Sequence, residues 1–150
     1  MLTLTQTLIL HVLTGLIGVM ASYTVLMNLL GKRFSLKLLK ISSVAAAVLY
    51  VISWLTGGYY YVIRYGVEVK PVIKAGDYPW AHSFFTEAKE HLFLFMPVVA
   101  IIVAAVVFLY GDTLNTTRSV KRTTTLLAFL VVLIGTFVTV SGIIISGSVR

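Results

Sequence analysis

The 150-residue chain contains no cysteine. Without a thiol it can form neither a disulfide nor a thiolate zinc site, and it can neither ligate an iron–sulfur cluster nor attach a c-type haem covalently. Charged residues are also scarce, at 11% of the chain, whereas hydrophobic residues make up 59%. A soluble domain of this size could not bury that much apolar surface, so we expect an all-α integral membrane protein.

Four apolar runs account for most of the length, and each is long enough to cross a hydrocarbon layer of about 30 Å. We expect a single four-helix membrane domain over residues 1–150, with helices over about 8–30, 41–62, 86–110 and 125–145. Between the second and third runs, Pro71, Gly76 and Pro79 indicate turns. We therefore expect an irregular external lid over about residues 65–84.

Basic residues gather in two of the three connections and set the expected orientation. The middle connection balances four basic residues with four acidic ones, whereas the other two carry a basic excess: Lys32, Arg33, Lys37 and Lys40 in the first, Arg118, Lys121 and Arg122 in the last. By the positive-inside rule both basic loops are cytoplasmic, and both termini and the lid lie outside. The net charge of +7 then reflects orientation and contact with anionic lipid, and it does not indicate nucleic-acid binding.

Two histidines fall at the same expected membrane depth on different helices. His11 and His91 each lie about twenty residues from a basic loop, which corresponds to one hydrocarbon thickness. Ionisable side chains at that level are costly and normally face the interior of a bundle, where they mark functional sites. His11 also shares a helix face with small and hydroxyl residues that are typical of a packing seam: Thr7, Thr14, Gly18 and Ser22.

One interpretation of these histidines is a haem b held between the first and third helices. Two imidazoles facing each other at one depth can ligate a haem iron, and the side-chain-free pair Gly57 and Gly58 would leave room for the ring. Arg64 and Lys89 lie near the expected outer surface, where propionates need cations. Such a protein would transfer electrons as a subunit of a larger complex.

A second interpretation is a transition-metal site. His11, Glu87 and His91 would provide the ligands, with Glu90 or His82 as further candidates, and this mixed set suits zinc, iron or copper. Glu87 and His91 are four residues apart and share a helix face, although the same spacing serves an ordinary helical hydrogen bond.

A third interpretation needs no cofactor. The histidines would then make structural hydrogen bonds, and the chain would be a non-catalytic accessory subunit that packs against other membrane subunits or copies of itself. A transporter fits less well, because the inner halves of all four helices lack charge. We expect no catalysis by the chain alone, since no nucleophile accompanies the histidines.

In topology alone the chain resembles small four-helix bacterial membrane proteins, among them membrane b-type cytochromes. The resemblance rests on four apolar runs and two histidines, and it assigns no role to any residue. It implies a bacterial or archaeal cytoplasmic membrane and favours the haem interpretation.

Overall fold

The computed structural model describes residues 3–32 and 34–149, and these contain helices and no β-strand. Four of the helical stretches are long and apolar enough to cross a membrane, which confirms the expected all-helical class. All four predicted segments are helical, and each lies within a continuous helical stretch that is longer than the prediction.

The first two helices form a tight antiparallel pair. α1 spans Leu4–Leu30 and begins at a capping box, in which Thr3 and Gln6 exchange side-chain-to-backbone hydrogen bonds. α2 spans Leu36–Tyr60. The connection between them is held by Asn28, whose amide donates to the carbonyl oxygen of Ser35 at 2.8 Å and accepts from its backbone N–H at 2.9 Å.

The helix that begins with α2 does not end at the predicted membrane surface. It continues through a π-helical segment, η1 (Tyr61–Val69), into α3 (Lys70–Ala75). The continuous stretch is 40 residues long. At 1.5 Å per residue it measures roughly 60 Å, about twice the thickness of the hydrocarbon layer.

The chain then returns along a second long stretch. A second π-helical segment, η2 (Ala81–Thr86), leads directly into α4 (Glu87–Tyr110) and the 3₁₀ turn η3 (Gly111–Thr113). α5 (Arg118–Gly147) completes the bundle. Around the bundle α1 packs against α2 and α5, and α4 packs against the same two helices, so α1 and α4 lie diagonally opposite each other.

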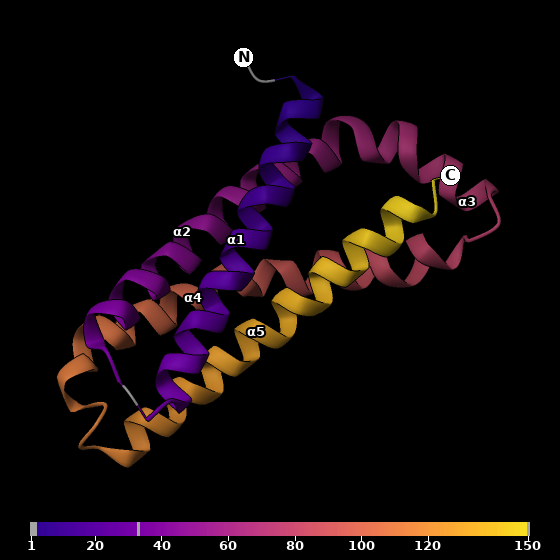
Figure 1. Cartoon of the computed structure of the whole chain (residues 1–150). Coiled ribbons are helices and arrows are strands. Elements are labelled where there is room, and N and C mark those ends of the chain that lie inside the picture. Colours follow the sequence, from indigo (N-terminus) through magenta and orange to yellow (C-terminus); the bar gives the residue numbers. More distant parts are fainter. Residues whose placement is uncertain (1–2, 33, 150) are drawn as a thin grey trace.

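The predicted irregular lid is wrong, because nearly all of it is helical. Residues 61–86, which we call the arm, form a helical hairpin that extends from one end of the bundle (Figure 1). Pro71 lies inside the continuous helical stretch where the helix changes from π to α geometry, and such a local adjustment accommodates the missing N–H. Tertiary packing overrides the local turn signals, since Tyr65, Ile73 and Ala81 are buried against each other and Ile145 of α5.

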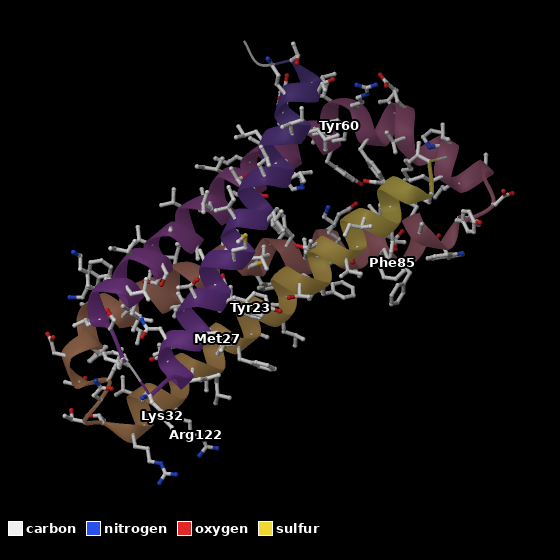
Figure 2. The ribbon with its side chains drawn as sticks, viewed as in Figure 1. Tyr23, Met27, Lys32, Tyr60, Phe85 and Arg122 are labelled. Atoms are coloured by element: carbon white, nitrogen blue, oxygen red, sulfur yellow. The ribbon has the colours of Figure 1, made fainter. Side chains whose placement is uncertain are left out.

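The two ends of the bundle differ in charge. Lys32 and Arg122 lie together at the end where both basic connections gather, here called the basic end (Figure 2). Both termini and the arm lie at the opposite end, the arm end (Figure 1). This arrangement matches the predicted pairing of connections and termini, and the assignment of the basic end to the cytoplasm stays a prediction from the positive-inside rule.

Tyr50 is the centre of the bundle core and is fully buried. Its hydroxyl lies 2.9 Å from the hydroxyl of Ser22 on α1. A Cβ on Gly18 would come within 2.9 Å of its ring, and one on Gly135 within 3.0 Å of its oxygen. The predicted seam of small residues on α1 is therefore a real contact surface, and it accommodates a tyrosine from α2.

Candidate functional site

His11 is held against α2 by reciprocal hydrogen bonds. Its Nδ1 lies 2.8 Å from the carbonyl oxygen of Ser53 and 3.0 Å from the Ser53 hydroxyl, which donates to the carbonyl oxygen of His11. A carbonyl oxygen can only accept, so Nδ1 carries the proton of the neutral ring. Nε2 is then unprotonated, and within the described residues it has no hydrogen-bond partner. His11 thus presents a free lone pair at the arm end.

Residues of α4 and α2 enclose the ring of His11. Phe93 on α4 lies against it in a T-shaped arrangement, with ring centroids 6.0 Å apart and planes at 90°. A Cβ on Gly57 would lie 2.5 Å from His11 Nδ1, whereas one on Gly58 would meet nothing within 4 Å. Gly57 does provide space, as its position suggests, and the imidazole itself fills that space.

His91 does not face His11. It is exposed on the same side of α4 as Leu94, Phe95 and Val98, and its Nδ1 lies 2.7 Å from the carbonyl oxygen of Glu87 in its own helix. His91 is two residues from Phe93, so at 3.6 residues per turn the two side chains point roughly 200° apart. The expectation that both histidines point into the interior is therefore correct for His11 and incorrect for His91.

The predicted metal ligands are not gathered into one set. Across residues 3–32 and 34–149, no three His, Asp or Glu side chains come close enough to hold a metal ion. The reason is rotational, because Glu87 and His91 share the exposed face of α4 while His11 points inward from the diagonal helix. Neither Glu90 nor His82 completes such a set.

Arg64 lies on the surface of the arm and is paired there. Its Nε is 2.8 Å from Oε2 of Glu68, one turn further along η1, and both side chains are substantially exposed. This is the one ion pair within the described part of the chain. The predicted propionate partner is thus already engaged with a carboxylate.

The arm contains a buried hydrogen-bonded cluster that joins its two halves. The hydroxyl of Tyr65 on η1 lies 3.0 Å from Nδ1 of His82 and 2.8 Å from Oγ1 of Thr86, both on η2. All three side chains are buried. The Thr86 hydroxyl also approaches the carbonyl oxygen of Ala81 at 3.4 Å, which orients its proton away from Tyr65. The chain of bonds then runs from His82 Nδ1–H through Tyr65 and Thr86 to Ala81.

Two buried side-chain polar atoms in the described structure lack a hydrogen-bond partner, and both lie near this cluster. They are Nε2 of His82 and Oε1 of Glu90. Glu90 lies beside the phenol of Tyr61, which stacks on Tyr65 at a centroid distance of 5.2 Å. Unsatisfied buried polar groups are rare and often accompany functional sites. The π-helical segments η1 and η2, a geometry also enriched at functional sites, meet at the same place.

Several of these residues were not singled out by the sequence. Ser53 is an ordinary serine in an apolar helix, Tyr65 fell in the expected lid, and Thr86 stood at the start of the expected third helix. The usable signal was the spacing of four residues between Tyr61 and Tyr65 and between His82 and Thr86. That spacing becomes informative only once the arm is known to be helical.

No protein-family model, curated protein or solved structure matches this chain. The class of the protein therefore follows from its own features: a helical bundle of the membrane-spanning type, in which the two unpartnered buried polar atoms of the described residues lie at the arm end.

Proposed function

We propose that this protein is a small membrane subunit that binds haem b at the arm end, with His11 as an iron ligand, and transfers electrons within a larger complex. The observation that supports the proposal is the state of the His11 ring. Imidazoles that bind metals are commonly held through Nδ1–H by a backbone carbonyl, which leaves Nε2 for the metal. His11 has this arrangement through Ser53.

The proposal needs only one histidine on the iron, as in haem proteins with a single proximal histidine. This accommodates the position of His91 on the exposed face of α4. Figure 1 shows the ends of α1 and α5 diverging at the arm end. Haem is favoured over a copper, iron or zinc ion because a protein-held ion needs several ligands, and the described residues gather no three.

A second candidate is a non-catalytic accessory subunit. It is favoured by the same pair of residues, since His11 and Ser53 satisfy each other and join α1 to α2 without any ligand. In that case the protein would act through contacts of its membrane helices with other subunits, and His11 would be a purely structural residue.

The experiment that separates the two candidates is spectroscopy of the full chain purified in detergent, oxidised and then reduced with dithionite, with metal analysis of the same sample. We expect the sharp bands of reduced haem b in the wild type, their loss in His11→Ala and their retention in His91→Ala. His91→Ala is the matched control, because it removes a histidine at the same depth on the exposed face.

His11→Ala could lose haem by unfolding, so a second variant is needed. His11→Gly with imidazole added to the buffer should recover the haem bands if the ring acts as a ligand, since free imidazole can enter the vacated space. Absence of haem from wild-type protein, even after expression with added haem precursor, would contradict the proposal and leave the accessory subunit. Loss of haem in His91→Ala as well would show that two histidines are required.

A further inference from the structure

The surface of the bundle carries a groove between α1 and α2 near the basic end, here called the α1–α2 groove. It has a volume of about 410 Å³ and is open to the outside of the bundle. Its lining residues are Tyr23, Thr24, Met27 and Asn28 of α1 and Leu38 of α2. Sites that hold small molecules have volumes of about 300–1,000 Å³. The groove is therefore large enough for one elongated ligand.

The groove runs along α1 through the leaflet next to the basic end. Figure 2 shows Tyr23 and Met27 following one another along α1 toward Lys32. Tyr23 and Lys32 are nine residues apart, which at 1.5 Å per residue is about 13 Å, close to half of a hydrocarbon layer of about 30 Å. Met27 and Leu38 are 63% and 46% exposed, so apolar side chains face whatever fills the groove. At this depth in a membrane an acyl chain suits such walls.

Two lysines flank the end of the groove that faces the membrane surface. The connection between α1 and α2 is fixed to the groove by the two hydrogen bonds between Asn28 and Ser35, and Lys32 belongs to this connection. Lys37 directly precedes Leu38, which lines the groove from α2. Both lysines are exposed, and neither takes part in an ion pair in the described structure.

The remaining charges at the basic end leave these two lysines available for an anion. Nζ of Lys40 lies 5.4 Å from the ring centroid of Phe108, and that of Lys121 lies 5.7 Å from the ring centroid of Phe34. The acidic residue of this end is Asp112, which lies on η3 between α4 and α5, away from the connection that carries Lys32. Seven basic residues thus stand against one acidic residue in the two connections, and the basic end attracts anions.

We propose that the α1–α2 groove binds one anionic phospholipid, with the headgroup phosphate between Lys32 and Lys37 and an acyl chain along Met27 and Tyr23. This inference goes beyond the proposed function and does not depend on haem. Charge complementarity selects the occupant, because a net negative headgroup gains from two nearby cations, whereas a zwitterionic headgroup carries its own cation. The bound lipid would hold α1 and α2 together at the end opposite His11.

The test measures lipid binding to the full chain by native mass spectrometry. The protein in detergent is titrated with phosphatidylglycerol or with phosphatidylcholine of the same acyl chains. We expect one phosphatidylglycerol to bind about 25-fold more tightly than phosphatidylcholine, because each lysine near an anionic headgroup contributes about fivefold.

Charge variants separate a defined site from the general attraction of the basic end. Lys32→Gln and Lys37→Gln should each weaken phosphatidylglycerol binding about fivefold and leave phosphatidylcholine binding unchanged. Arg118→Gln is the matched control, because Arg118 is an exposed cation at the same end, at the start of α5. It should leave both affinities unchanged.

A second pair of variants tests the groove itself without changing the charge. Leu38→Trp should fill the groove and abolish the tight binding of phosphatidylglycerol, whereas Val48→Trp, at an exposed position of α2 outside the groove, should not. Circular dichroism checks that the variants fold.

Three outcomes would overturn the inference. Equal affinities of the wild type for the two lipids would mean that the groove accepts any lipid. Equal losses in Arg118→Gln and Lys32→Gln would mean that charge attracts the lipid without a defined site. Unchanged phosphatidylglycerol binding in Leu38→Trp would mean that the lipid binds outside the groove.

Discussion

The imidazole of His11 occupies the space that Gly57 leaves open by having no side chain. The two residues lie on different helices and are 46 positions apart in the chain, yet a Cβ on Gly57 would come within 2.6 Å of two atoms of the ring. The hydrogen bonds to Ser53, one turn before Gly57, hold the ring in that position. At the arm end, α1 and α2 therefore pack closely because the His11 ring fits against Gly57.

Gly57→Ala should destabilise the protein, whereas Gly58→Ala should not. The new methyl group at position 57 overlaps His11 and must displace a ring held by hydrogen bonds, which we expect to cost about 1–3 kcal/mol. At position 58 a methyl group meets nothing, and alanine is the better helix former. Thermal unfolding of both variants in the same detergent measures the difference. Equal stability of the two would show that His11 is not confined by Gly57.

Tyr50→Phe and Ser22→Ala should weaken the same interhelical contact. Each variant removes one partner of the buried 2.9 Å hydrogen bond between α1 and α2, at an expected cost of about 0.5–1.5 kcal/mol. Because both act on one bond, the double variant should cost less than the sum of the two. The measurement is a double-mutant cycle on the free energy of unfolding, and strictly additive effects would argue against the bond.

Tyr65→Phe should loosen the arm without disrupting the four-helix bundle. The change leaves His82 and Thr86 without the hydroxyl that joins η1 to η2, and buried polar groups that lose a partner cost about 1–3 kcal/mol each. Amide hydrogen exchange should therefore increase in residues 61–86 and stay unchanged in α5. Tyr59→Phe, at an exposed position on α2, serves as control. Unchanged exchange in the arm would mean that apolar packing alone secures it.

The absence of cysteine makes the membrane orientation directly measurable, because any introduced thiol is the only one. Asp77→Cys lies in the link of the arm, and Thr116→Cys lies in the connection before α5 at the basic end. In intact cells an impermeant maleimide should label position 77, and it should reach position 116 only after permeabilisation. The reverse pattern would contradict the positive-inside assignment.

The predicted helices and the predicted lid show where sequence reasoning succeeds and where it stops. The apolar runs were recognisable because hydropathy over about twenty residues is a property of the segment itself. Pro71, Gly76 and the β-branched residues near them are also local signals, and they indicated an irregular connection. The arm is helical because Tyr65, Ile73 and Ala81 pack together. This packing joins the two halves of the helical hairpin. A pattern of neighbouring residues in the sequence cannot predict it, because the contacting residues are far apart in the chain.

The candidate site also has some features that the sequence predicts and others that depend on tertiary packing. The sequence by itself determined the class of the protein and the number of long apolar helices, since these depend on composition and on counting along the chain. Only the tertiary structure decided which of the two histidines points inward. The direction of a side chain around a helix axis depends on what that helix packs against. For His11 the determinants are Ser53, Gly57 and Phe93, which lie on other helices and far away in the sequence.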